Sequence, residues 1–131
     1  MNMHLVFIPF LTILLLSSKY LQSSTPKYPY DPKLITEQSE INFAITDKRG
    51  ILSAEGTVYF ISPTEESTIV ACRDKKFLWK VNAASQCGSA SVHQAVRYLK
   101  LTSTKLEVIY GKHSFLTIKL STGQVTCQGS D

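Results

Sequence analysis

The chain has 131 residues, three cysteines and a formal net charge of +4, and this length allows one ordinary domain. Its basic residues are scattered, and the one local cluster is Arg73, Lys75 and Lys76. A nucleic-acid-binding protein would carry a basic face with interleaved aromatic residues or a recognisable motif, and neither is present in the sequence. Charge and composition therefore exclude nucleic acid as an expected partner.

The N-terminus carries an apolar run at residues 5–16, which small and polar residues follow at 17–25. The run is shorter than the roughly 20 residues that span a bilayer, and it has the length of a signal-peptide core. We expect residues 1–24 to be a signal peptide, which makes the mature protein secreted or periplasmic, with no membrane span. An uncleaved N-terminal anchor is the alternative.

Residues 25–33 contain Pro26, Pro29 and Pro32. Proline fixes its own φ and biases the preceding residue towards extended chain. We therefore expect a Pro-rich linker at 25–33 and a single folded domain at 34–131.

The folded region shows the alternation and the β-branched and aromatic enrichment of strands. In the segment 41–47, Ile41, Phe43 and Ile45 are expected on one face of a strand, and the segment 48–50 is expected to be a turn in which Gly50 takes a positive φ. Phe77, Trp79 and Val81 are likewise expected to share a face. The predicted strands are residues 41–47, 57–62, 68–72, 77–81, 95–101, 105–110, 114–120 and 124–128.

A shift of 39 residues superimposes two segments of this pattern and aligns Trp79 with Ile118. Turns align as well as strands, which indicates an internal repeat at 57–85 and 96–124. The segments TIVACRDKKFLWKVNAAS and LEVIYGKHSFLTIKLSTGQV resemble blades of quinoprotein-type (PQQ-like) β-propellers, and the whole chain resembles small exported bacterial proteins of unknown function. The resemblance implies no catalytic, cofactor-binding or metal-binding residue in this chain.

The expected fold is all-β, with two blade-like antiparallel sheets of about four strands each, arranged as an incomplete propeller or a β-sandwich. Trp79 and Ile118 are the expected core anchors, because a Trp buries a large area in a small core. Two blades cannot close a ring. Apolar surface left open on such a unit predicts a partner, either a protein or envelope component or a second copy of the chain.

In an exported protein, three cysteines predict one disulfide and one free thiol. Cys87 aligns with residue 126 in the repeat, one position before Cys127. Equivalent ends of adjacent blades would bring these two cysteines together, so the repeat predicts a Cys87–Cys127 disulfide.

No nucleophile motif, metal-ligand spacing or phosphate-binding loop occurs in the sequence. We therefore expect a non-enzymatic domain with no cofactor, which acts by binding. The alternative is a small exported enzyme or redox protein that uses Cys72, because the neighbouring Arg73, Lys75 and Lys76 would lower the pKa of its thiol.

Overall fold

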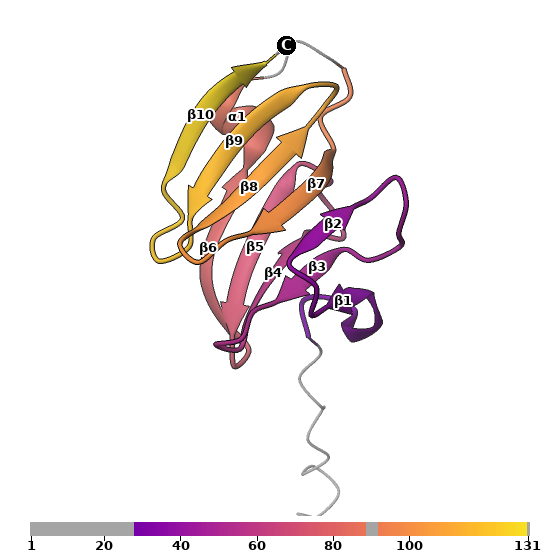
Figure 1. Cartoon of the computed structure of the whole chain (residues 1–131), viewed down its shortest axis with the longest axis vertical. Helices are drawn as coiled ribbons and strands as arrows, with labels where there is room; N and C mark the ends of the chain where they lie inside the picture. Colours follow the sequence, from indigo (N-terminus) through magenta and orange to yellow (C-terminus); the bar gives the residue numbers. More distant parts are fainter. Residues whose placement is uncertain (1–27, 89–91, 131) are drawn as a thin grey trace, which may run out of the picture.

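The computed structural model describes residues 28–88 and 92–130, which form ten strands and one short α-helix (Figure 1). The strands make two sheets of five strands each. The predicted all-β class with two antiparallel-rich sheets is confirmed, with five strands in each sheet where about four were expected.

The first sheet, sheet A, has the order β1-β3-β4-β5-β6. Strand β1 runs parallel to β3, and every other pair in the sheet is antiparallel. The strands are β1 (Ile35–Thr36), β3 (Gly50–Leu52), β4 (Thr57–Ile61), β5 (Thr68–Arg73) and β6 (Lys76–Asn82).

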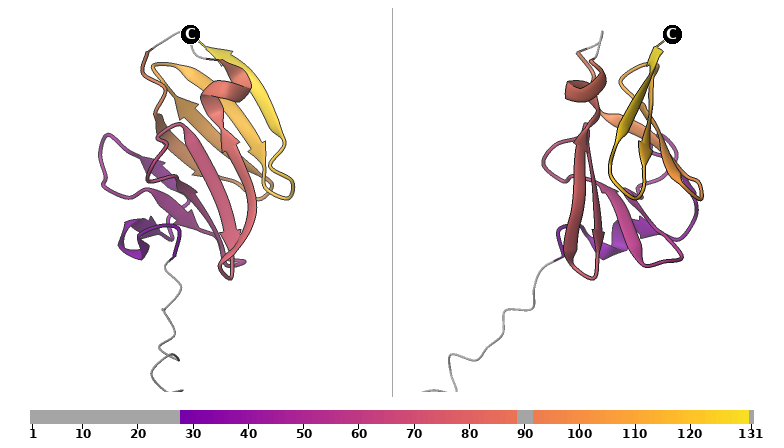
Figure 2. Two further views of the ribbon diagram at one scale, coloured as in Figure 1. Left: turned by 180° about the vertical axis from the view of Figure 1, so that it is seen from behind. Right: turned by 90° about the vertical axis from the view of Figure 1, so that its left-hand side faces the viewer.

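The second sheet, sheet B, has the order β10-β9-β8-β7-β2 and is antiparallel throughout. Its strands are β2 (Glu40–Asn42), β7 (Val96–Leu101), β8 (Lys105–Tyr110), β9 (Ser114–Lys119) and β10 (Val125–Ser130). The two sheets lie face to face, as the edge-on view of Figure 2 shows.

The main core fills the space between the two sheets, where inward-facing side chains of both interdigitate. Its largest completely buried members come from both sheets. They include Ile51, Ile69, Ile41, Leu99, Leu106, Val108, Tyr110, Leu116 and Ile118.

Trp79 and Ile118 both lie in this core, as the sequence predicts for them. Trp79 belongs to β6, and its indole Nε1 donates a hydrogen bond of 2.9 Å to the carbonyl oxygen of Leu120, beyond the end of β9. The side chain therefore fills the core and also joins sheet A to sheet B.

The predicted repeat corresponds to one three-stranded meander in each sheet. Adding 39 to the first residues of β4, β5 and β6 gives 96, 107 and 115, and β7, β8 and β9 begin at residues 96, 105 and 114. Each copy of the repeat thus supplies three consecutive strands of a different sheet.

The predicted strand at 41–47 is wrong beyond Asn42. The side-chain oxygen of Asn42 accepts a hydrogen bond from the Ala44 amide, and its carbonyl oxygen accepts from the Ile45 amide. These bonds form the local turn that Asn favours over continued pairing. Ile41 is buried, whereas Ile45 is 83% exposed.

The predicted positive φ at Gly50 is also wrong, because Gly50 begins β3 and is not among the residues with positive φ. A Cβ atom there would lie 2.6 Å from Cδ1 of Ile35 and 2.7 Å from Cβ of Phe60. Gly50 is therefore required by close packing of β1 and β4, and not by turn geometry.

Helix α1 (Ala83–Cys87) follows β6 and crosses towards β10 (Figure 1). Asn82 caps its N-terminus by accepting a hydrogen bond of 3.0 Å from the Ser85 amide. The helix places Cys87 beside β10, and the structure contains the predicted Cys87–Cys127 disulfide, with the two Cα atoms 5.5 Å apart.

The described part of the predicted linker, residues 28–33, contacts sheet A. The ring of Tyr30 lies 5.0 Å from that of Phe60, and Pro32–Leu34 form a 3₁₀ turn capped by Asp31. Lys48 fixes this turn, because its Nζ donates a hydrogen bond of 2.7 Å to the carbonyl oxygen of Lys33. Ordered packing therefore begins before residue 34, where the sequence placed the domain boundary.

Candidate binding surface

A second, smaller apolar cluster covers the outer face of sheet A. Its buried members are Val58, Phe60 and Cys72. Both faces of the central strand β4 are therefore buried, which explains why its sequence, TVYFI, lacks polar alternation. Tyr30, Ile35, Leu52 and Val70 pack against this cluster.

Residues 28–35, which we call the N-terminal segment, cross this outer face. A hollow lies on each side of Tyr30. One hollow has a volume of about 470 Å³ and lies next to the β5–β6 hairpin. Its lining is Tyr28, Tyr30, Leu52, Gly56, Val58, Cys72, Asp74 and Lys75. The other has a volume of about 270 Å³, and Phe60 and Arg49 are among its lining residues.

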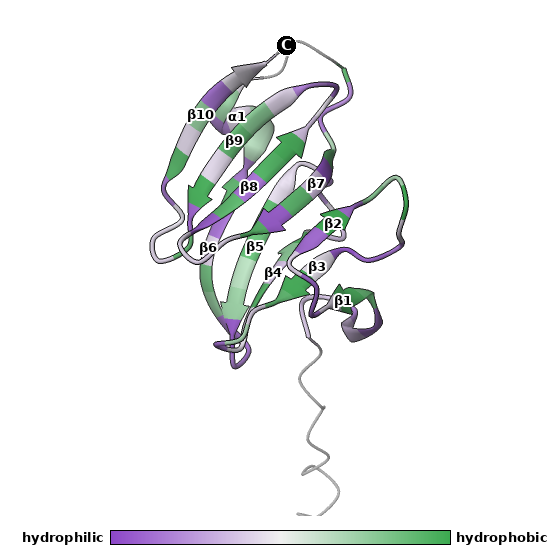
Figure 3. Ribbon diagram, viewed as in Figure 1, coloured by the Kyte–Doolittle hydropathy of each residue, from purple (hydrophilic) through white to green (hydrophobic). Residues whose placement is uncertain are grey.

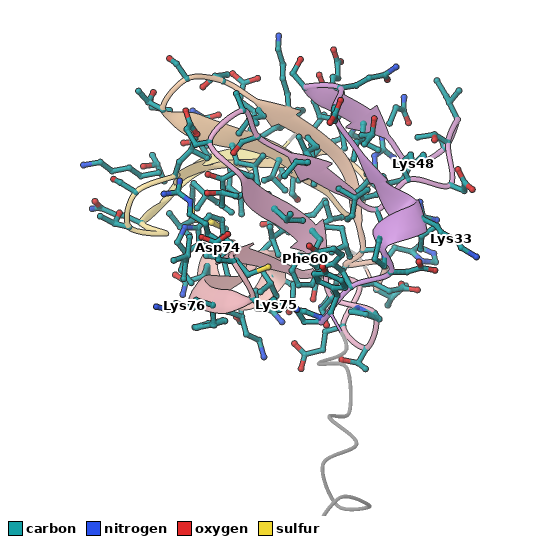
Figure 4. All side chains as sticks on the ribbon, turned by 90° about the horizontal axis from the view of Figure 1, so that it is seen from below. Lys33, Lys48, Phe60, Asp74, Lys75 and Lys76 are labelled. Atoms are coloured by element: carbon teal, nitrogen blue, oxygen red, sulfur yellow. A yellow bond between two sulfur atoms is a disulfide. The ribbon has the colours of Figure 1, made fainter. Side chains whose placement is uncertain are left out.

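The β5–β6 hairpin turns at Asp74 and Lys75, whose φ angles are +50° and +64°. Two consecutive residues with positive φ are characteristic of the two-residue turn that matches the twist of antiparallel strands. The turn is hydrophilic and projects beyond the apolar strands, as the colouring of Figure 3 shows. It carries Lys75 and Lys76 to the end of the molecule at which the described chain begins (Figure 4).

A β-bulge in β6 changes the direction of the side chains next to this turn. Ala71 pairs with Trp79, whereas the next residue, Cys72, pairs with Phe77, so Leu78 is an extra residue without a partner. Paired residues share a face, and consecutive residues of β5 do not. Phe77 therefore faces outwards with Cys72, and the prediction that Phe77 shares a face with Trp79 is wrong.

Large apolar side chains are consequently exposed beside the hairpin turn. Phe77 is 64% exposed, Leu78 is 48% exposed, and Tyr28 is 47% exposed. The Lys75 ammonium lies 5.1 Å from the centre of the Tyr28 ring, within the range of a cation–π contact. We call Tyr28, Lys75, Lys76, Phe77 and Leu78 the basal surface.

Cys72 lies under this surface as the free cysteine of the described chain, and it is buried. Burial raises the pKa of its thiol, because the charged thiolate loses hydration. The alternative of a reactive thiol at Cys72 assumed the opposite direction from the nearby basic residues, and burial contradicts it. Arg73 is engaged elsewhere: its Nε donates a hydrogen bond of 2.9 Å to the hydroxyl oxygen of Thr57.

The cysteines and core anchors singled out in the sequence do not gather into one site. Cys87 and Cys127 join α1 to β10, Trp79 and Ile118 lie in the core, and Cys72 faces the other side of sheet A. Sequence reasoning missed the basal surface. The pair of tyrosines in the Pro-rich segment YPYDP was a signal for it, because aromatic residues that need burial are unusual in a solvated linker.

Two further observations apply to residues 28–88 and 92–130. They contain no cluster of three or more His, Cys, Asp or Glu side chains arranged to hold a metal ion. No helix among them is long and apolar enough to span a bilayer.

In comparisons with known proteins, no family model, curated protein or solved structure matches the chain.

Proposed function

We propose that the chain is an exported, non-catalytic β domain that acts by binding a component of the cell envelope through its basal surface. Export is supported by the apolar run at residues 5–16 and the small polar residues that follow it. The observation that carries the binding role is the exposure of Phe77, Leu78 and Tyr28 beside a hollow of about 470 Å³.

This exposure is informative because the neighbouring apolar side chains are covered. The N-terminal segment shields Phe60 and Val58, but it leaves the end of the hairpin open. Adjacent large apolar side chains that stay exposed on a soluble domain commonly mark a site of interaction. The bulge at Leu78 turns Phe77 outwards, and bulges often re-aim a side chain next to a functional site.

The environment of Cys72 supports a binding role over thiol chemistry. Its side chain is buried and its thiol pKa is raised, so the neutral form dominates at neutral pH. A reactive cysteine needs a partly exposed, electropositive setting in which the thiolate is stabilised. Under native conditions at neutral pH we expect an alkylating probe to label Cys72 slowly, and rapid labelling would instead favour a redox or enzymatic role.

Site-specific photo-crosslinking in cells that export the protein tests the proposed function. A photoreactive amino acid at Phe77 is expected to yield adducts that are absent when the same amino acid replaces Ile45. Ile45 is the matched control because it is a large apolar residue, 83% exposed, in the β2–β3 connection. Failure to form adducts from position 77, or the same adducts from both positions, would contradict the proposal.

A further inference from the structure

We infer that the component bound by the basal surface is the anionic surface of a lipid bilayer. This inference rests on the proposed function and specifies the ligand of the same surface. The side chains involved are Tyr28, Lys75, Lys76, Phe77 and Leu78, which lie together at one end of sheet A.

The chain enters the described fold at this end of the domain, a short distance in sequence after the N-terminal apolar run. The apolar run at residues 5–16 precedes Tyr28, where the described fold begins, by twelve residues. Twelve residues span at most about 40 Å when fully extended. If the run is retained as an anchor, Tyr28 therefore lies within about 40 Å of the membrane that holds it.

The composition of the basal surface fits the interfacial layer of a bilayer. Aromatic and aliphatic side chains enter the boundary between headgroups and acyl chains, and flanking lysines remain among the phosphates. Phe77 and Leu78 supply the apolar part, and Tyr28 has an aromatic ring with a polar hydroxyl. Lys75 lies in the adjacent turn, and Lys76 is the first residue of β6.

The charges around the basal surface favour an anionic partner. The segment from Arg73 to Lys76 contains three basic residues and one acidic residue, Asp74. Lys33 and Lys48 are also seen from this end of the molecule, across from Lys75 and Lys76 (Figure 4). Basic residues therefore lie on two sides of this end. Two further acidic residues lie on this side of sheet A. The charge of Glu55, in the β3–β4 connection, acts on Tyr59 of the adjoining strand, and Glu37 lines a hollow with Leu52 and Gly56.

The hairpin presents these groups on a short, well-defined projection. The turn has two residues, and Cys72 and Arg73 on β5 pair with Phe77 and Lys76 on β6. Such a projection can enter the headgroup layer without rearrangement of the domain. A few partly inserted side chains and a few lysines give weak, reversible binding that depends on anionic lipid and decreases with salt.

Fluorescence quenching by brominated lipids locates the contact on the full-length protein. The variant Phe77→Trp is expected to be quenched by vesicles of brominated phosphatidylcholine mixed with phosphatidylglycerol. The matched variant Ile45→Trp and the wild type, whose single Trp79 is buried, are expected to be quenched much less. Because the N-terminal apolar run also leads into the fold at Tyr28, the measurement is repeated on residues 25–131, which lack the run. Quenching at position 77 that is lost together with the run would also overturn the inference. Equal quenching at both positions, or none at position 77, would overturn the inference.

Charge neutralisation tests the lysines. Each basic residue near an anionic surface strengthens binding about 5-fold, so Lys75→Gln/Lys76→Gln is expected to weaken binding to the phosphatidylglycerol vesicles about 30-fold. Binding to vesicles of phosphatidylcholine alone should not change. The control is Arg97→Gln/Lys112→Gln, two exposed basic residues of the other sheet, in β7 and in the β8–β9 connection. An equal loss in both double variants, or no loss in either, would refute the lipid assignment.

The two proposals fail separately in these experiments. Photo-crosslinks from position 77 to a protein, without lipid quenching, would overturn the lipid assignment and leave the proposed binding function standing. Crosslinks only to a second copy of the chain would overturn both proposals, because the proposed function requires a component of the cell envelope. Absence of both crosslinks and quenching at position 77 would overturn both proposals.

Discussion

Replacing Gly123 by alanine tests the docking of Trp79 on the opposite sheet. Gly123 has a φ of +77°, and a Cβ atom there would lie 2.7 Å from Cγ and 2.9 Å from Cβ of Trp79. The Trp79 Cβ is fixed to the backbone of β6, and the indole is held by its hydrogen bond to Leu120. A rotamer change therefore cannot relieve the contact, and the β9–β10 turn or β6 must move.

Two costs contribute to the expected loss of stability. A left-handed backbone conformation costs a residue with a Cβ about 1–2 kcal/mol, and overpacking of a fitted core costs about 1–3 kcal/mol more. We therefore expect Gly123→Ala to lower the free energy of unfolding by about 2–5 kcal/mol.

The control is Gly56→Ala, because Gly56 has a similar φ of +87° and nothing within 4 Å of its hypothetical Cβ. This variant should show only the conformational cost of about 1–2 kcal/mol. Equilibrium urea unfolding, followed by the fluorescence of the single, buried Trp79, measures both variants on one scale. Equal destabilisation by the two substitutions would refute the argument that Gly123 is required by contact with Trp79.

Three more predictions concern other parts of the structure. Cys87→Ala/Cys127→Ala should lower the unfolding free energy by about 4 kcal/mol, as chain entropy gives for a closed loop of this size; a change below about 1 kcal/mol in urea unfolding would contradict this. The sequence separation between these two cysteines is 40 residues. Lys75→Gly should raise the free energy of unfolding by up to about 1 kcal/mol, because glycine adopts a positive φ without strain. A melting temperature lower than that of the wild type would contradict this and would show that the cation–π contact with residue 28 matters more. The pKa of Tyr98 is raised to about 12. Burial is the larger cause, and the second cause is the hydrogen bond that the Tyr98 hydroxyl donates to the Glu40 carboxylate. The folded state therefore binds the hydroxyl proton of Tyr98 more tightly than the unfolded state does. The stability that this protonated hydroxyl contributes should be lost as the pH rises from about 10 to about 12. Spectrophotometric titration should give a lower pKa for Tyr98 in Glu40→Gln, and an unchanged value would contradict the role of the carboxylate.

Hydropathy alternation was sufficient to predict most of the strands and the two-sheet architecture. The predicted segments at 57–62, 68–72, 77–81 and 105–110 overlap β4, β5, β6 and β8. These strands are five to seven residues long, enough for a period of two to emerge. Strands β1 and β3 have only two and three residues, which is too short for a pattern, so the predicted number of strands per sheet was too low.

The repeat was informative about contacts between distant residues. Its alignment of Cys87 with the position before Cys127 led to the disulfide that the structure contains. The repeat could not establish whether the two meanders descend from propeller blades, and that resemblance stays a prediction. Pairing of sheet edges depends on packing of the whole chain, which a 39-residue self-similarity does not encode.

The basal surface could not be predicted, because it depends on one irregularity in strand pairing. Strict alternation places Phe77 and Trp79 on one face, and only the register of β5 against β6 shows that Leu78 is an extra residue. A bulge of this kind has no reliable signature in a single sequence, since no glycine marks it. The covering of sheet A by Tyr30 was missed for a similar reason: prolines indicated extended chain, but not the surface against which that chain packs.

Strand β6 combines two roles that the bulge separates. Beyond the bulge, Trp79 and Val81 point into the main core, and the hydrogen bond to Leu120 and the nearby disulfide hold the two sheets together. Before the bulge, Phe77 points outwards beside a charged turn. Changes at the turn should therefore alter binding with little effect on the joint between the sheets, because no core side chain lies in that part of the strand. This separation allows one edge strand to stabilise the fold at one end and to present the proposed binding surface at the other.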